Sequence, residues 1–146
     1  EGNGWSFAHA RRLWSLAENG YLRYELLGNF DKAMIALIRK YDVLEGGMPR
    51  CLRQHEDDQI LAFEKKGCVF VFNFHPTRSQ TGLFVPVPEK GDYQVILSTD
   101  DKTFGGYQSI AKSVVSHTWA HDPQMGDGFV IYLPARTAVV LRKIDK

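Results

Sequence analysis

Hydrophobic positions recur with a helical period over the first 45 residues and with a strand period after that. The first predicted helix runs from Trp5 to Asn19, with Gly20 as a stop signal. The second begins at Leu22 and ends at Gly46-Gly47, before Pro49. Each helix carries its apolar residues on one face: Phe7, Ala10, Leu13, Trp14 and Ala17 in the first, and Leu22, Leu26, Phe30, Met34, Leu37 and Tyr41 in the second. Both helices are therefore predicted to pack one side against another part of the protein.

The rest of the chain consists of short apolar or alternating runs that are separated by turn residues. These runs predict six to eight strands at a spacing of about ten residues: Ile60–Phe63, Cys68–Phe74, Leu83–Val87, Tyr93–Leu97, Phe129–Leu133 and Thr137–Ile144. Because no helical pattern lies between them, we expect a mainly β fold, an antiparallel β-sandwich, rather than a parallel sheet. Two strands are predicted to place three large side chains on one face: Phe70, Phe72 and Phe74, and Tyr93, Val95 and Leu97.

The change of period divides the chain into a helical part, residues 1–47, and an all-β part, residues 48–146. Two amphipathic helices have no further helices of this chain to pack against. We therefore expect them either to cover one end of the sandwich or to belong to a neighbouring domain. The chain begins at Glu1 without a methionine, which we interpret as a cut end.

Composition narrows the class of protein and of partner. With 146 residues and 44% hydrophobic residues, the chain can bury a core without a disulfide or a metal. Eighteen basic residues against 17 acidic ones argue against nucleic acid or an anionic membrane as the main partner. No apolar run has the length of a membrane span. Cys51 and Cys68 are expected to be two lone buried thiols of a cytoplasmic protein rather than a disulfide.

The side chains that carry chemistry do not form a predicted active site. His117 and His121 have a zinc spacing only in a helix, and the alternation of Val114–Trp119 predicts a strand, so we expect no metal site. His75 is expected to lie at the end of a strand and to form hydrogen bonds with a turn. The carboxylates lie in charged turns, and no nucleophile or phosphate-loop motif occurs, so we expect no catalytic residue and no cofactor.

Aromatic residues give the one functional hint that composition offers. Trp5, Trp14 and Trp119, together with six tyrosines, are able to stack on the faces of sugar rings. Against this, Trp14 and most of the tyrosines are expected to pack in the core or between domains.

Nine short stretches follow one another along nearly the whole chain: residues 1–7, 10–16, 22–24, 30–34, 62–64, 71–76, 91–93, 104–106 and 134–138. In this order they resemble the C-terminal end of the α-1,4-glucan (glycogen or starch) branching enzymes, and the eukaryotic-type branch in particular. Five positions depart from the family pattern: Phe7, Leu13, Gln80, Gly82 and Ser98.

The resemblance implies a glycosyltransferase of the α-amylase superfamily, with a TIM-type barrel followed by a C-terminal all-β domain. Such an enzyme cleaves an α-1,4 linkage, holds the chain on a carboxylate and transfers it to a 6-hydroxyl. The family's catalytic carboxylates lie upstream of the motif that opens this chain, so none is assigned here. Residues 1–47 are then expected to be the last barrel helices, and the expected partners are the catalytic barrel of the same protein and α-glucan. Trp5 and Trp119 are the expected glucan contacts.

Two alternatives stay open. A self-standing carbohydrate-binding module would carry a coplanar row of exposed aromatic rings on the sandwich. A purely structural interface domain would instead expose an apolar patch near the helices.

Overall fold

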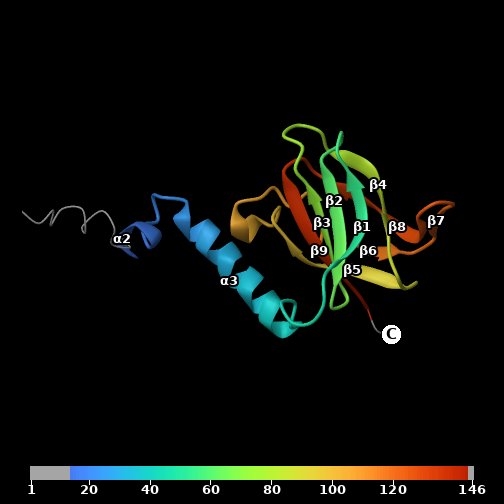
Figure 1. The fold of residues 1–146 in the computed structure, drawn as a ribbon. Helices are drawn as coiled ribbons and strands as arrows, with labels where there is room; N and C mark the ends of the chain where they lie inside the picture. Colours follow the sequence, from blue (N-terminus) through green and yellow to red (C-terminus); the bar gives the residue numbers. More distant parts are fainter. Residues whose placement is uncertain (1–13, 145–146) are drawn as a thin grey trace, which may run out of the picture.

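A computed structural model describes residues 14–144, and in this range the chain folds into a helical segment followed by a two-layer β-sandwich (Figure 1). The helices are α2 (Trp14–Ala17), α3 (Tyr24–Lys40) and the short 3₁₀ helix η1 (Lys102–Phe104). The strands are β1 (Arg50–His55), β2 (Ile60–Lys65), β3 (Cys68–Asn73), β4 (Gln80–Pro86), β5 (Asp92–Ser98), β6 (Val115–His117), β7 (Ala120–Asp122), β8 (Gly126–Leu133) and β9 (Thr137–Lys143). The predicted mainly β fold is confirmed.

The strands form a six-stranded sheet in the order β1-β2-β3-β9-β5-β6 and a three-stranded sheet in the order β4-β8-β7. Every strand pairing is antiparallel. Alternate residues of both sheets meet in one buried core, where Phe129, Leu133 and Leu141 are fully enclosed. The period-2 pattern of the sequence thus corresponds to two inner faces that pack against each other.

A second apolar cluster lies on the outer face of the six-stranded sheet, under α3. Leu37 of α3 and Val43 meet Cys68, Leu97 and Val140 of the sheet in this cluster. Figure 1 shows α3 beside this face, on the side opposite to the three-stranded sheet. The helix therefore covers the sandwich from outside rather than contributing to the core between the sheets.

A β-bulge makes β5 contribute to both clusters. The pairing of β5 with β9 shifts between Val95 and Leu97. Tyr93 and Val95 point into the core between the sheets, whereas Leu97 packs under α3. The expectation that these three side chains share one face was wrong, because the extra residue of a bulge reverses the alternation of the side chains.

Both predicted helix ends were placed too late in the chain. Helix α3 ends at Lys40 rather than at Gly46-Gly47, because Asp42 adopts a left-handed conformation (φ 50°) and the Val43 N–H donates to the Ile38 carbonyl at 3.0 Å. This is the hydrogen bond of a Schellman cap, with aspartate in the place that glycine usually takes. Helix α2 ends at Ala17, before Asn19, and residues 5–13 of the predicted first helix lie outside the described residues.

The sheets contain nine strands, more than the six to eight expected. The six predicted runs all correspond to strands, and the alternation at Val114–Trp119 corresponds to β6. The strands β1 and β7 were not predicted from the sequence. Both are largely exposed and polar, since they lie at sheet edges, so they lack the hydrophobic alternation that marks a half-buried strand.

Candidate functional site

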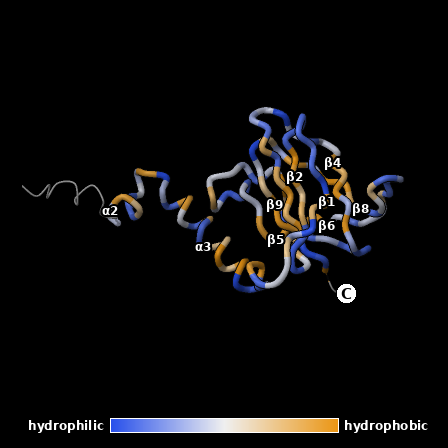
Figure 2. Tube along the Cα trace, viewed as in Figure 1, coloured by the Kyte–Doolittle hydropathy of each residue, from blue (hydrophilic) through white to orange (hydrophobic). Residues whose placement is uncertain are grey.

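An apolar cavity of about 350 Å³ separates α3 from the outer face of the six-stranded sheet. Phe30, Met34 and Ile38 line it from the helix, and Lys65 and Thr99 are the polar residues of its wall. Figure 2 shows hydrophobic residues both along the strands of this sheet and along α3. The helix thus covers this face incompletely and leaves an apolar groove beneath it.

A row of phenylalanine rings extends this apolar face along β2 and β3. The Phe63 ring stacks on Phe70 and on Phe72, with centroid distances of 4.8 and 5.9 Å, and Phe72 stacks on Phe74 at 5.4 Å. The prediction that Phe70, Phe72 and Phe74 share a face is confirmed. Only Phe74 of the four is exposed, and the others are half-buried. The row is therefore a packing surface rather than the exposed platform of a carbohydrate-binding module.

Helix α3 carries a second apolar face that the sandwich does not cover. Tyr24, Leu27 and Ile35 are exposed, and Leu27 exposes 66% of its surface. Their helical spacing places them on one side of α3, next to the side that faces the sheet. Only the apolar stripe that faces the sheet was predicted from the sequence, although Tyr24, Leu27 and Ile35 also follow a helical spacing. Exposed Trp14 and Leu16 on α2 continue the apolar surface.

The loop after β5 fixes η1 against α3. The Asp100 carboxylate, which is buried, accepts hydrogen bonds from the backbone N–H groups of Tyr107 and Ser109 at 3.0 and 2.5 Å. At Gly106 any Cβ would lie 2.2 Å from the Asp100 carbonyl, so only glycine allows the backbone to pass. The Phe104 ring of η1 meets Phe30 edge-on at 5.4 Å. This loop therefore holds α3 in place.

Trp119 lies between β6 and β7, and 86% of its surface is exposed. The imidazole ring of His117 stacks on the indole at 4.7 Å with 10° between the planes. His117 is held in turn, since its Nδ1 lies 2.6 Å from an Asp92 carboxylate oxygen. The sequence pointed to Trp119 but missed His117, because the two rings stack across the end of β6, which the sequence does not mark. Trp5, the other expected glucan contact, lies outside the described residues.

The two histidines that were considered as possible zinc ligands, His117 and His121, belong to different sheets. His117 is on β6 of the six-stranded sheet, and His121 is on β7 of the three-stranded sheet, where its Nδ1 lies 2.9 Å from Asp127. The chain passes from one sheet to the other between these two histidines. Within residues 14–144, no group of three or more metal-ligating side chains comes together.

Within residues 14–144, four carboxyl groups have a lowered pKa, which keeps them deprotonated near neutral pH. A hydrogen bond from Lys112 lowers the pKa of Asp101 to about 2. A hydrogen bond from Arg78 lowers that of Asp58, and His121 together with Lys90 lowers that of Asp127. Backbone N–H groups of Met125 and Gln124 lower the pKa of Asp122. A general acid of a glycosidase-type reaction requires the opposite shift, so none of these four suits that role.

His75 stabilises a turn, as predicted. Its Nδ1 accepts hydrogen bonds from the backbone N–H groups of Thr77 and Arg78 at 3.2 and 2.8 Å. The adjoining Asn73 is buried, and its side-chain NH₂ donates to the carbonyls of Arg78, Leu133 and Pro134. This asparagine ties β3 to the chain segment between β8 and β9, so the polar residues of the Asn73–Pro76 turn have a structural role.

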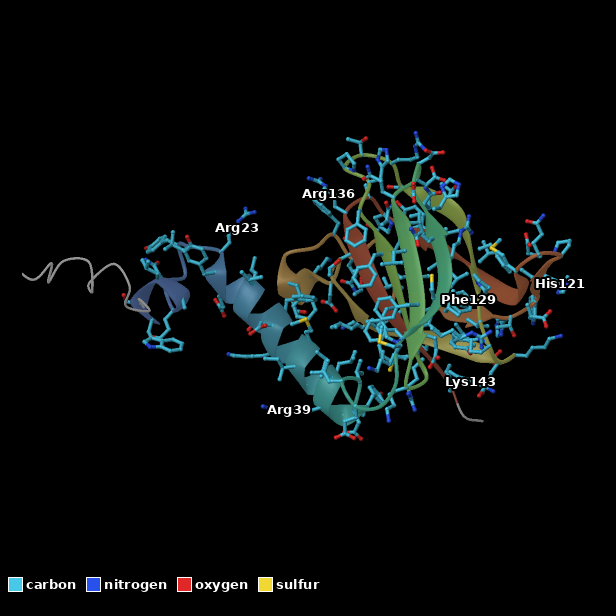
Figure 3. All side chains as sticks on the ribbon, in the orientation of Figure 1. Arg23, Arg39, His121, Phe129, Arg136 and Lys143 are labelled. Carbon is cyan, nitrogen blue, oxygen red and sulfur yellow. The ribbon has the colours of Figure 1, made fainter. Side chains whose placement is uncertain are left out.

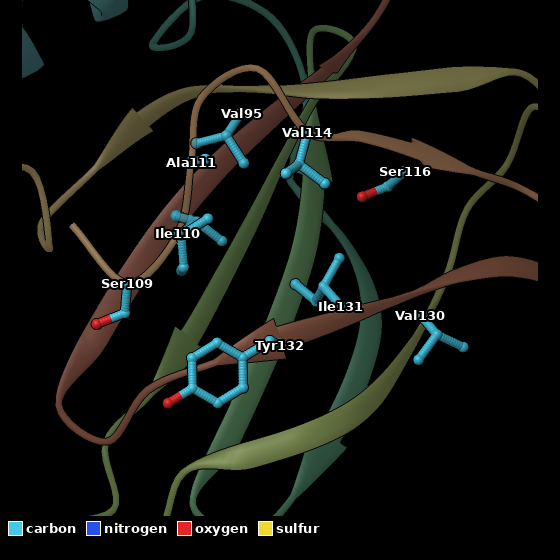
Figure 4. A pocket seen from close by; sticks show the side chains of 10 residues that line it. Val95, Ser109, Ile110, Ala111, Val114, Ser116, Val130, Ile131 and Tyr132 are labelled. Carbon is cyan, nitrogen blue, oxygen red and sulfur yellow. The ribbon is translucent and has the colours of Figure 1, made fainter.

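A further cavity, of about 160 Å³, lies between the loop at residues 109–114 and β8 and is lined mostly by aliphatic side chains (Figure 4). Cys68 is buried on β3, Cys51 is exposed on β1, and no disulfide joins them. None of the described helices combines the length and the apolar character that crossing a membrane requires.

Comparison with known proteins gives a consistent set of relatives. Residues 52–144 match the family described as Alpha amylase, C-terminal all-beta domain. The 1,4-alpha-glucan-branching enzyme of Eremothecium gossypii is 41% identical over 143 residues, which cover 97% of this chain and 20% of that protein. The enzymes of the same name from Dictyostelium discoideum and Felis catus are 38% and 33% identical, over 99% of this chain and 22% and 21% of those proteins. The chain thus spans about a fifth of the length of these relatives.

Proposed function

Because the chain belongs to the alpha-amylase C-terminal all-beta domain family, we propose that it is the C-terminal part of a 1,4-alpha-glucan-branching enzyme. Its own role in that enzyme is to support the catalytic barrel. The relatives that carry this name extend over about five times the length that the chain matches. The remainder of such a protein supplies the barrel and the catalytic carboxylates.

The observation that carries this proposal is the pair of apolar faces on α3. One face packs on the sandwich through Phe30, Met34 and Leu37. The other exposes Tyr24, Leu27 and Ile35. A surface helix of a self-contained domain has one apolar face, since its other side meets water. A helix with two apolar faces suits a position between two bodies, here the sandwich and the barrel.

The same proposal divides the chain at residues 47 and 48. The helical part, residues 1–47, belongs to the barrel, and residues 48–146 form the all-β domain. The end of α3 at Lys40 and the family match from residue 52 support a division in this region. The unpaired cysteines suit the reducing cytoplasm, where we place the protein.

A self-standing carbohydrate-binding module is the second candidate, and one observation favours it. Trp119 presents an exposed indole that is able to stack on a sugar ring. The phenylalanine row does not add to this surface, because three of its four rings are half-buried. We therefore rank support of the barrel first and glucan contact as an additional role of the same chain.

A chimeric enzyme tests the supporting role. The region of the Eremothecium gossypii enzyme that matches this chain is replaced by the chain itself. Branching activity is measured as the loss of iodine-stained amylose absorbance. We expect the chimera to be active and the isolated 146-residue chain to be inactive. Activity of the isolated chain would contradict the proposal.

A matched pair of variants in the chimera locates the contact. Leu27→Asp places a charge on the second apolar face of α3 and is expected to abolish activity or assembly of the chimera. Ala36→Asp places the same charge at an exposed position on the polar side of α3 and is expected to be tolerated. Equal tolerance of both substitutions would show that the second face does not contact the barrel.

A further inference from the structure

We propose that His117 and Trp119 form a contact site for α-glucan chains on the sandwich, remote from the face that docks on the barrel. This proposal rests on the proposed function, since the class of ligand follows from the branching-enzyme assignment. The site itself follows from the geometry of two side chains and the loop that carries them.

The backbone that carries Trp119 is fixed by a reciprocal pair of hydrogen bonds. The Thr118 N–H donates to the Gly91 carbonyl at 3.2 Å, and the Gly91 N–H donates to the Thr118 hydroxyl at 2.8 Å. The Trp119 N–H donates to the His117 carbonyl at 2.9 Å. The exposed indole is therefore attached to a braced turn between the edges of the two sheets, which lowers the entropy lost when a ligand binds.

The ring of His117 holds the indole in one orientation. Its near-parallel stacking supports one side of the indole, and the Asp92 carboxylate fixes the imidazole at 2.6 Å. A rigid aromatic face is what the C–H groups of a pyranose ring pack against. Exposure of 86% leaves this indole accessible for such a contact.

Polar groups flank, along the chain, the turn that carries the two rings. Lys90, which precedes Gly91, forms an ion pair with Asp127 at 3.0 Å, and the same carboxylate binds His121. These groups offer both donors and acceptors to the hydroxyl groups of an uncharged polysaccharide. The mixed charges give no preference for an anionic or a cationic partner.

The size of the apolar surface favours a sugar over a protein partner. One aromatic side chain contributes about 150–250 Å². A specific protein interface buries at least about 1,000 Å² in total. A single indole within a polar rim matches the face of one or two glucose units. By contrast, α3 exposes three large hydrophobic side chains, Tyr24, Leu27 and Ile35.

The position of the site keeps it accessible in the complete enzyme that we propose. Figure 1 shows β7 at the end of the sandwich that is farthest from α2 and α3, and in Figure 3 the label of His121 marks this end. Trp119 directly precedes β7. A barrel docked on α3 would therefore leave this end open to the polymer.

Affinity electrophoresis of the 146-residue chain in gels that contain glycogen tests the site. We expect the chain to be retarded, and Trp119→Ala to weaken the apparent Kd by about tenfold, as loss of one stacking contact implies. His117→Asn keeps a donor near Asp92 but removes the stacked ring, so we expect a smaller loss. The control Tyr107→Ala removes an equally exposed aromatic ring from another loop and is expected to leave retardation unchanged.

Two results would overturn the proposal: a wild-type chain that glycogen does not retard, or a Trp119→Ala chain that is retarded like the wild type. Urea unfolding of each variant verifies that the fold is intact, since these exposed substitutions should leave the midpoint unchanged. The docking test with Leu27→Asp has a separate readout. If glycogen does not retard the chain but Leu27→Asp inactivates the chimera, the proposed glucan site is wrong and the supporting role stands.

Discussion

The two apolar clusters of this molecule share strands but differ in how completely they are closed. The cluster between the sheets is enclosed on both sides, and Phe129 and Leu141 in it have no exposed surface. The cluster under α3 is enclosed on one side only and leaves a cavity of about 350 Å³. Neighbouring residues of β9 serve both, since Val139 points to the first and Val140 to the second. The first cluster closes the sandwich by itself, whereas the second leaves apolar surface open beneath α3.

The largest effect is expected from emptying the closed cluster. Phe129→Ala should lower the free energy of unfolding by about 3–5 kcal/mol, because a large cavity opens where no side chain can move in. The half-buried Phe70 on the outer face provides the comparison, and Phe70→Ala should cost less than half as much, since water already reaches that ring. Urea unfolding measures both, and equal losses would mean that the outer face is as closed as the inner core.

Asn73 connects the two sheets, and its removal should have the next largest effect. Asn73→Ala leaves the carbonyls of Leu133 and Pro134 without their side-chain donor. Unfolding free energy should fall by about 2–3 kcal/mol. Asn73→Asp should cost more, because a carboxylate would face three carbonyl oxygens. His75→Ala is the milder control, since it removes hydrogen bonds that are exposed to water.

The buried phenol of Tyr93 should make the stability of the closed cluster depend on pH in the alkaline range. Burial raises its pKa from 10.0 to about 12, and nearby Glu89 adds to the shift. The neutral phenol is therefore favoured in the folded state, so the stability that it contributes is present below pH 10 and is lost as the pH rises towards 12. The urea midpoint should fall over this range.

The variant Tyr93→Phe separates this titration from the others. It removes the hydrogen bond from the phenol to the Glu89 carbonyl, at a cost of about 1 kcal/mol near neutral pH. The fall of the urea midpoint at alkaline pH should also become smaller in this variant. An unchanged alkaline profile in this variant would assign the loss to other groups.

The smallest effect on stability is expected at the second apolar face of α3, which the sandwich does not cover. Leu27→Asp should change the unfolding free energy of the isolated chain by less than about 0.5 kcal/mol, because the side chain is exposed there. The same substitution is expected to be severe in the chimera. A large destabilisation of the isolated chain would mean that Leu27 already packs within it, and would place the open face elsewhere.

Much of the sandwich was predictable because strands that build a core stand out as short apolar or alternating runs. The strands β2, β3, β5, β8 and β9 contain such runs. The edge strands β1 and β7 do not, since most of their side chains face water. The face of Leu97 was not predictable, because a bulge depends on the partner strand and has no marker in the sequence of β5. The end of α3 was missed for a local reason, as Asp42 takes a conformation usually left to glycine.

The candidate site was predicted only in part. The sequence identified Trp119 as one of three tryptophans that are able to stack on a sugar ring. It did not identify His117 as its support, because stacking between residues two apart requires knowledge of where the strand ends. The second face of α3 was hidden by the stronger stripe beside it, in which Phe30, Met34 and Leu37 already account for an amphipathic helix.

The bulge in β5 has a consequence for how motion spreads through the molecule. Because one strand is anchored in both clusters, opening the region under α3 pulls on the segment that also carries Tyr93 and Val95. Local unfolding of the two regions is therefore coupled. A body that binds to α3 would slow amide hydrogen exchange in β5 and β9, two of the strands on which α3 packs. Binding would then make the sandwich more rigid without changing its shape.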